Sequence, residues 1–152
     1  MALIPATLHT GLLRMFRLNA AANGAQGASD FARAYFAYAA PAMSAYGPFI
    51  PTGTEQLRLE SILRASILPI GAPLLIAQAW GSGLQAFWTG AVFGTGAATA
   101  LPGAAAVVGA LNGVLSSNRN TAEVAAARMA SAIDIATRTL VIGGPGGPVP
   151  VF

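Results

Sequence analysis

Residues 65 to 118 read ASILPIGAPLLIAQAWGSGLQAFWTGAVFGTGAATALPGAAAVVGALNGVLSSN, and none of these 54 positions carries a charged side chain. The run lies between Arg64 and Arg119 and is dense in Ala and Gly. Its large aromatic residues are Trp80, Phe87, Trp88 and Phe93. A stretch of this length and composition must be shielded from water. A lipid bilayer, a domain core or the neighbouring subunits of an assembly would each shield it.

The composition of the whole chain extends this picture. With 152 residues the chain is long enough for one domain, and 55% of its residues are hydrophobic while only 9% are charged, against an ordinary charged share of about 25%. The chain has eight basic residues, all of them Arg, and five acidic residues, which give a net charge of +3. A freely soluble monomer needs a charged surface to stay dispersed. The composition therefore predicts that something else covers much of the exterior.

The spacing of apolar residues predicts a mainly α-helical fold, a small helical bundle joined by loops rich in Gly and Pro. The sixth helix has the clearest signal, because Asn120 and Glu123 stand in the capping-box relation ahead of an amphipathic pattern. Residues 46–53 and 90–103 hold too much Gly and Pro for a helix and are expected to be loops. The helices expected are residues 4–18, 29–41, 54–67, 74–92, 104–115 and 120–138.

The end of the chain differs from the rest in its composition. Residues 139–142 form a short strand-like run, and residues 143–152 read GGPGGPVPVF, which cannot be helical. We therefore expect a single helical domain over 1–142 and an extended C-terminal arm over 143–152. The arm would reach onto a neighbouring subunit, where residues 140–142 would add to a sheet. A frayed tail is the alternative.

A membrane location is the main rival to burial by protein. Residues 74–92 approach the length of about 20 apolar residues that a membrane-spanning helix needs, and the segments 90–94 and 109–113 match the small-xxx-small pattern of packed membrane helices. The run is nevertheless rich in Ala and Gly rather than in Leu and Ile, and Gln78, Gln85 and Pro102 interrupt it. These features favour cover by protein subunits, whose obligate interfaces resemble a domain core.

The residues needed for catalysis or for binding a cofactor are scarce. His9 is the only histidine, there is no cysteine, and the five acidic residues stand apart from one another. Metal sites need several such residues at set spacings. The Gly-rich segments 94–96 and 143–147 lack the lysine and the strand-loop-helix order of a phosphate-binding loop. The sequence therefore predicts a protein that is not an enzyme and has no cofactor or metal.

Short segments of the chain resemble small structural proteins of tailed-bacteriophage virions. The words that carry the resemblance are AFWTG at 86–90, the Gly-rich stretch that follows it, and IATRTLVI at 135–142, so that it covers about residues 75 to 145. It implies a non-enzymatic subunit repeated by symmetry in a tail, baseplate or neck, located in the virion and bound to copies of itself and to other virion proteins. It transfers no functional residues.

The expected function is therefore that of a virion structural protein, which assembles by subunit packing. One alternative is a small membrane protein with a two-helix hairpin, such as a holin-like or complex-associated protein. A second alternative is a subunit that lines a passage for DNA, with Arg14, Arg17 or Arg128 facing the phosphates. The interface residues expected from the sequence are Trp80, Phe87, Trp88, Phe93, Leu140, Val141, Ile142, Val151 and Phe152.

Overall fold

The computed structural model describes residues 3–17, 24–67, 73–117 and 119–152. In these residues the order α-α-β-β occurs three times along the chain. The helices are α1 (Pro5–Arg17), α2 (Gly24–Ala39), α3 (Thr54–Ile67), α4 (Pro73–Trp88), α5 (Ala104–Leu115) and α6 (Ala122–Arg138). The strands are β1 (Met43–Ser44), β2 (Gly47–Ile50), β3 (Val92–Phe93), β4 (Gly96–Ala100), β5 (Val141–Gly143) and β6 (Val149–Pro150). The expectation of a helical bundle is wrong, because the fold combines helices with a sheet.

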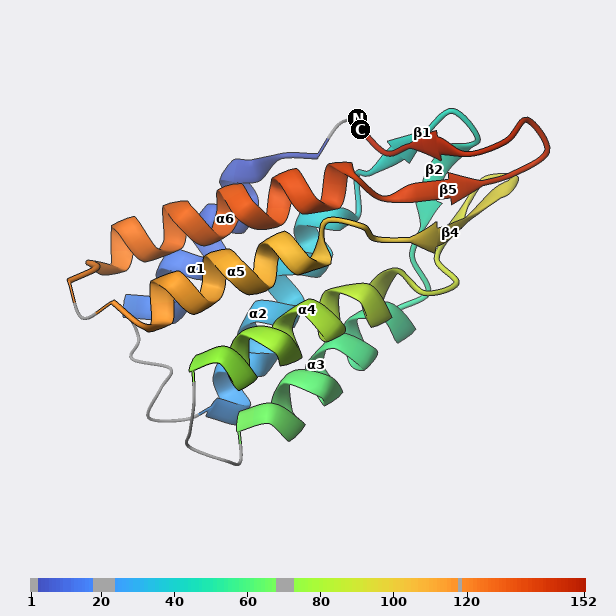
Figure 1. Ribbon diagram of the computed structural model, residues 1–152. Helices are drawn as coiled ribbons and strands as arrows, with labels where there is room; N and C mark the ends of the chain where they lie inside the picture. Colours follow the sequence, from blue (N-terminus) through green and yellow to red (C-terminus); the bar gives the residue numbers. More distant parts are fainter. Residues whose placement is uncertain (1–2, 18–23, 68–72, 118) are drawn as a thin grey trace.

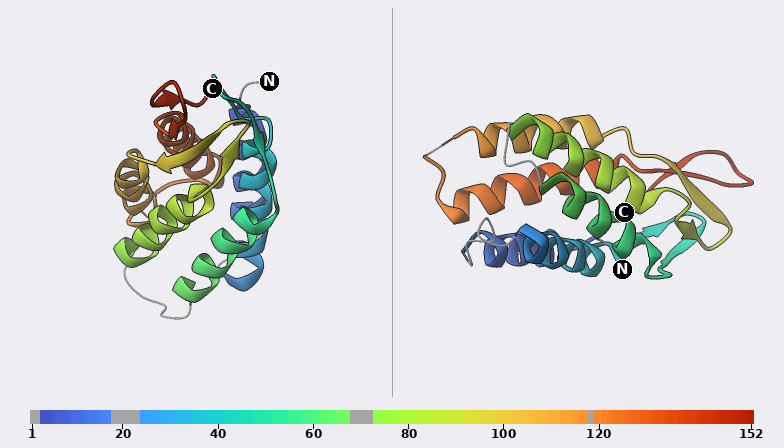
Figure 2. Two further views of the ribbon diagram at one scale, coloured as in Figure 1. Left: turned by 90° about the vertical axis from the view of Figure 1, so that its right-hand side faces the viewer. Right: turned by 90° about the horizontal axis from the view of Figure 1, so that it is seen from below.

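The helices form a closed ring. Each helix packs against the next one along the chain, and α6 packs against α1. The left view in Figure 2, which looks towards the sheet end of the helices, shows this circular arrangement. The described strands lie at one end of the ring, and the last residues of α1, α3 and α5 point towards the other end (Figure 1). This arrangement follows from the chain order, because a hairpin after every second helix returns the chain to the same end.

The six strands form one antiparallel sheet in the order β1-β2-β3-β4-β5-β6, which closes almost into a barrel. The closing contact joins β1 to the residues that follow β6. The amide of Met43 donates to the carbonyl of Phe152 at 3.0 Å, and the amide of Phe152 donates to the carbonyl of Met43 at 2.9 Å. Ser44 and Val151 form a bridge beside this pair. Closure satisfies backbone groups that an open sheet edge would expose.

The three α-α-β-β units are structural repeats, and from the second helix to the first strand of each unit the equivalent positions are 49 residues apart. Ala28, Ala77 and Ala126 occupy the same place on α2, α4 and α6, and all three are buried. The same interval relates Ser44, Phe93 and Ile142, which are buried in the three hairpins. The fold is therefore a pseudo-threefold ring, in which these equivalent positions are all buried although the positions in the hairpins differ in residue type.

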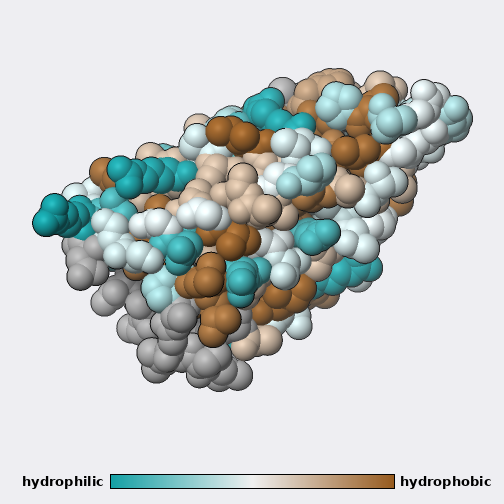
Figure 3. Space-filling model, viewed as in Figure 1, coloured by the Kyte–Doolittle hydropathy of each residue, from teal (hydrophilic) through white to brown (hydrophobic). Residues whose placement is uncertain are grey.

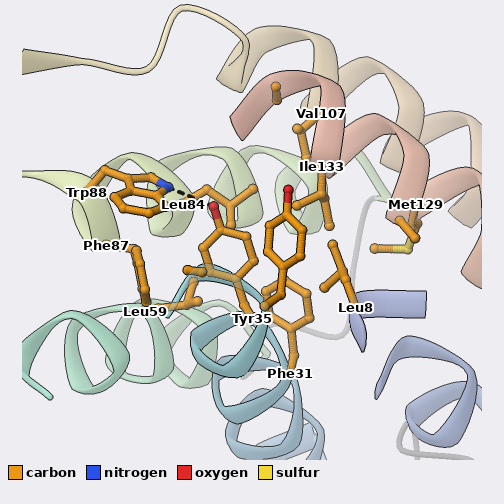
Figure 4. Close-up of a cluster of buried hydrophobic side chains, with 14 of the residues drawn as sticks. Leu8, Phe31, Tyr35, Leu59, Leu84, Phe87, Trp88, Val107, Met129 and Ile133 are labelled. Carbon is orange, nitrogen blue, oxygen red and sulfur yellow. Dashed lines mark hydrogen bonds between the residues drawn. The ribbon is translucent and has the colours of Figure 1, made fainter. Parts of the chain in front are cut away.

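Side chains from every helix meet inside the ring, as Figure 4 shows. The centre is aromatic: the ring centroids of Phe31 and Trp80 lie 4.1 Å apart, and those of Tyr35 and Phe87 lie 4.8 Å apart. Such pairs add about 0.5–1.5 kcal/mol each beyond the area that they bury. The core thus fills the space that a ring of six helices would otherwise leave as a channel.

A chain of buried hydrogen bonds joins the three repeats at this centre. The indole N–H of Trp88 on α4 donates to the Tyr35 hydroxyl on α2 at 2.7 Å. The hydroxyl of Thr137 on α6 donates to the carbonyl of Ile133 at 2.8 Å, so its oxygen accepts the proton of Tyr35 at 2.9 Å. Burial raises the pKa of Tyr35 above its ordinary value. Every polar atom of this network is satisfied, which fixes how the three repeats meet.

The end of the chain departs from its expected role. The extended arm is wrong, because β5 and β6 form the third hairpin, β6 turns back onto β5, and the residues that follow β6 close the sheet against β1. Val151 is only 3% exposed. The tyrosine hydroxyl of Tyr46 also donates to the carbonyl of Gly147 in the connection between β5 and β6. Residues 141–152 are therefore part of the folded domain.

Several element boundaries also differ from the sequence prediction. Helix α2 begins at Gly24, ahead of the start expected at residue 29. Helix α4 ends at Trp88, and Gly90 then takes a φ of 76°, a conformation that ends a helix and starts the β3–β4 hairpin. The cap of α6 is Thr121, whose hydroxyl accepts the amide of Val124, while Asn120 donates its side-chain amide to the carbonyl of Val114. The strand-like run after α6 is confirmed as β5.

Candidate interaction surface

The uncharged run of the sequence forms one side of the molecule. Its described residues make up α4, β3, β4 and α5, which are neighbours in the ring and in the sheet. Their inward residues belong to the core: Leu84, Phe87, Phe93 and Leu111 are all at most 2% exposed. The chain itself therefore covers the inner face of this side. Packing within the core does not account for the residues on the outer face of this side.

The outer face of this side is apolar or small in most positions. Leu74 and Leu75 on α4 are exposed, Leu75 by 57%. On α5 the exposed positions are Ala105, Ala106, Gly109 and Gly113. Figure 3 views this side, and brown and pale residues cover most of the surface there. The hydrophilic residues gather at the end opposite the sheet or stand singly. A helix exposed to water usually carries charged residues here, so this face is suited to contact with protein.

An open groove of about 650 Å³ lies on the surface between α5 and α6. Its α5 wall is formed by Gly109, Ala110, Gly113 and Val114, and its α6 wall by Ala127, Arg128, Ser131, Ala132 and Ile135. Ile135 stands at the groove with 61% of its side chain exposed. A second groove, of about 420 Å³, runs between α4 and α5 past Gly81 and Val108. Both grooves border α5.

The helical glycines on this side fall into two kinds. A Cβ atom placed on Gly81 would lie 2.6 Å from Cγ2 of Val108, and one on Gly83 would lie 2.9 Å from Cδ1 of Leu59. These glycines allow neighbouring helices of the ring to pack closely. A Cβ atom on Gly109 or Gly113 would meet no atom of the described residues within 4 Å. Nothing described in the chain requires glycine at these two positions.

A third groove, of about 340 Å³ between α1 and α6, brings together residue types used in hydrolysis: His9, Ser131 and Asp134. Their hydrogen bonds do not form a catalytic relay. The carboxylate of Asp134 accepts the Tyr38 hydroxyl at 2.7 Å and the Nε of Arg138 at 2.9 Å, and no hydrogen bond joins His9 to Ser131 or Asp134 in the described part of the chain. Burial, followed by the bond to Asp134, raises the pKa of Tyr38. The hydrogen bond between Tyr38 and Asp134 therefore joins α2 to α6.

The acidic residues are all used within the chain. Four of them pair with Arg17, Arg33, Arg64 and Arg138. Glu55 is buried and accepts the amide and hydroxyl of Thr52 at the start of α3. The positive charge therefore remains on arginines that lack a carboxylate partner in the described residues. Two of the arginines considered for a DNA passage, Arg14 and Arg17, lie in the last turn of α1. The guanidinium of Arg17 lies 2.6 Å from the carboxylate of Glu123 and holds the pKa of Glu123 below its usual value.

The structure places most interface residues expected from the sequence inside the chain. Trp80 is partly buried against Phe31, Val141 is partly buried in β5, and Phe152 is 49% exposed. The remaining six are buried in the core: Phe87, Trp88, Phe93, Leu140, Ile142 and Val151. Sequence reasoning did not select Gly109 and Gly113 as interface residues, although their spacing in the GxxxG pattern was the available signal.

Among the described residues, none of the helices is both long enough and apolar enough to cross a membrane. Those residues also contain no group of three or more His, Cys, Asp or Glu placed to hold a metal ion.

Comparison with protein-family models, with curated proteins and with solved structures gave no match to this chain.

Proposed function

We propose that this protein is a non-enzymatic structural subunit that acts by packing against other protein subunits through the side formed by α4, β3, β4 and α5. The observation that carries the proposal is the outer face of this side. It is formed by a run of the chain without any charged residue, and it combines exposed leucines with helical glycines that nothing described in the chain requires. Water is a poor partner for such a surface, and another protein is a good one.

The distribution of charge supports the same proposal. The carboxylates that form ion pairs are engaged with arginines of the chain, and every charged residue of the chain lies outside α4, β3, β4 and α5. The resemblance to phage structural proteins suggests the kind of particle in which such a subunit works, a virion, with its own copies and other virion proteins as partners. A tail, baseplate or neck position is part of this proposal.

The test follows the protein into assembled particles. Particles are purified by density gradient from cells that produce the chain with its native neighbours, and its amount relative to the main particle protein is measured by mass spectrometry. We expect a constant ratio between preparations. We expect the Leu75→Glu variant to fold but to be lost from particles, because a carboxylate on the α4 surface would be desolvated in the contact.

The matched control is Ser61→Glu, which places the same charge at an exposed position of α3, on another part of the ring. This variant should enter particles like the unmodified chain. Absence of the unmodified chain from purified particles would remove the proposed function. Recovery of the protein in membranes after carbonate washing would instead support the membrane alternative.

A further inference from the structure

We infer that the corner of the molecule where α1 ends and α6 begins binds the phosphate backbone of a nucleic acid. Four exposed arginines form this basic corner: Arg14 and Arg17 in the last turn of α1, Arg119 ahead of α6, and Arg128 in α6. None of them belongs to α4, β3, β4 or α5. Binding at the basic corner is therefore an activity beyond the proposed packing, and it uses a different surface.

The distribution of charge along the chain singles out the basic corner. Its four arginines are accompanied by one acidic residue, Glu123 in the first turn of α6, so its side chains carry a charge of +3. The rest of the molecule holds four arginines and four acidic residues, whose charges cancel: Arg33, Arg58, Arg64, Arg138, Asp30, Glu55, Glu60 and Asp134. The whole net charge of +3 thus lies at one corner.

The packing of α1 on α6 brings these arginines together. The end of α1 meets the start of α6 at the end of the ring opposite the sheet (Figure 1). The guanidinium of Arg17 lies 2.6 Å from the carboxylate of Glu123. Arg14 precedes Arg17 by one helical turn and lies on the same side of α1. Residues 102 or more positions apart in the sequence therefore form one charged surface.

Two of the four arginines have no partner that would explain them. Arg14 and Arg119 are exposed, and the described part of the chain shows neither an ion pair nor a side-chain hydrogen bond for either of them. Arg128 donates to the side chain of Asn120 at 3.5 Å, which directs its guanidinium towards the same corner. These guanidinium groups can take up an anion without breaking a strong contact within the chain.

A nucleic acid is the polyanion that fits such groups. A guanidinium is planar and presents paired N–H donors that match the oxygens of a phosphate. Nucleic acids carry phosphates at short, regular intervals, so each arginine finds one without a matched set of acidic residues on a protein partner. Contacts to phosphate carry no sequence information, and binding should therefore be independent of base sequence.

The helices of the basic corner do not suit a lipid surface. A helix that binds to a membrane surface lies in its plane and buries an apolar face in the lipid. The apolar face of α1 is already used, because Leu8, Leu12 and Met15 are buried in the core. Only the last turn of α1 and the start of α6 reach the basic corner, and these offer charge rather than an apolar face.

Fluorescence anisotropy of a labelled DNA duplex of mixed sequence, titrated with the purified full chain, tests the inference. We expect binding that weakens as salt is added. The logarithm of the association constant should fall with the logarithm of salt concentration with a slope of about −3, since about three phosphates are neutralised. A second duplex of unrelated sequence should bind equally well.

Matched double variants locate the site. Arg14→Gln, Arg119→Gln should weaken binding at low salt about tenfold or more and bring the slope to about −1. The control Arg33→Gln, Arg64→Gln removes the same two charges from exposed arginines of α2 and α3 that pair with acidic residues, and it should bind nearly as the wild type does. Thermal unfolding by circular dichroism checks that both variants are folded.

The variant Glu123→Gln gives a gain of binding, which misfolding cannot imitate. It removes the one acidic side chain of the basic corner and frees Arg17, so it should bind DNA more tightly than the wild type. Weaker binding by this variant would contradict the assignment.

Three other results would overturn the inference. The first is a wild type that does not bind DNA at low salt. The second is an equal loss of affinity in the two double variants, because net charge alone would then explain binding. The third is binding to vesicles of phosphatidylglycerol without binding to DNA. None of these results removes the proposed function, which depends on recovery of the chain in particles and on the Leu75→Glu variant.

Discussion

The inner and outer faces of the α4–α5 side are formed by the same uncharged run, and they differ in how far the chain itself accounts for their residues. On the inner face, Trp88 and Phe87 pack into the aromatic centre, and Gly81 is held against Val108. On the outer face, Gly109 and Gly113 have no such neighbour in the described residues. Residues of one composition thus serve two kinds of burial. The first is complete in the single chain, and the second is the burial that the proposed contact with another subunit would supply.

This difference defines what each variant should show. Changes on the inner face or in the closed sheet should reduce the stability of the single chain. Changes on the outer face should leave that stability unchanged or improve it, and should affect association instead.

Removal of residues 143–152 should have the largest effect. The deletion takes away β6 and the closing contacts with β1, including buried Val151 and two backbone hydrogen bonds. Burial of one valine contributes roughly 2 kcal/mol and each hydrogen bond about 1 kcal/mol, so we expect a loss of about 4 kcal/mol out of a typical 5–15 kcal/mol. Urea unfolding monitored by circular dichroism measures the loss.

The control for this deletion is Phe152→Ala, which keeps the backbone pair with Met43 and removes a half-exposed side chain. Its effect should be well below that of the deletion. If the truncated chain unfolded at the same urea concentration as the full chain, the closing contacts of the sheet would contribute nothing to stability.

The helices could be predicted from the sequence, and the sheet could not. Apolar periodicity is visible over helices of 12 to 17 residues, whereas each strand has only two to five residues, many of them Gly, Ala or Pro. Pairing between hairpins 49 residues apart produces the sheet, and no local pattern records it. The repeat itself is hard to see, because Ala28, Ala77 and Ala126 agree in identity while Ser44, Phe93 and Ile142 agree only in burial.

The proposed interaction surface could be predicted only in part, because local sequence patterns do not show which side of each helix faces inward. The absence of charge over residues 65–118 indicated a surface shielded by protein, and the GxxxG spacing marked residues 109–113. Large aromatic residues were the natural choice for contacts, yet Trp88 and Phe93 are the residues that a ring of six helices needs at its centre. Which side of a helix faces inward depends on the ring, and a single amphipathic pattern is weak in segments where both sides are apolar.

Alkaline pH should strongly destabilise the core of the single chain, to which Tyr35 and Tyr38 of α2 belong. Burial raises the pKa of both Tyr35 and Tyr38 above the unfolded value of about 10, so their contribution is fully present below pH 10 and is lost as the pH rises further. Above about pH 10 the unfolded chain releases two protons that the folded chain keeps. Stability should therefore fall by about 2.7 kcal/mol per pH unit.

Urea unfolding at several pH values between 9 and 11.5 gives this slope. In Tyr38→Phe only one of these protons remains, and the slope contributed by the pair should fall to about half. An identical slope in the variant and the wild type would show that Tyr38 ionises in the folded protein as it does in the unfolded chain.

Tyr35→Phe should destabilise the single chain by about 2 kcal/mol, because it leaves the indole N–H of Trp88 buried without its acceptor. The double variant Tyr35→Phe, Trp88→Phe removes both the hydroxyl and the indole N–H, so it leaves no buried donor without an acceptor. Its loss of unfolding free energy should therefore be smaller than the sum of the losses in the two single variants. A double-mutant cycle measured by urea unfolding gives the coupling between the two residues. Strict additivity would mean that the hydrogen bond between the repeats does not contribute to stability.

The smallest effects separate the two faces most directly. Gly81→Ala and Gly109→Ala are the same chemical change on two adjacent helices of the uncharged side. The first places a methyl group 2.6 Å from Cγ2 of Val108 and should cost about 1 kcal/mol or more through overpacking, even after the gain in helix propensity. The second meets open space and should stabilise the monomer by about 0.5–1 kcal/mol. Both values come from unfolding at concentrations low enough to keep the chain monomeric. Opposite signs would establish that the chain explains one glycine and not the other, and only the glycine it does not explain can belong to a contact with a partner.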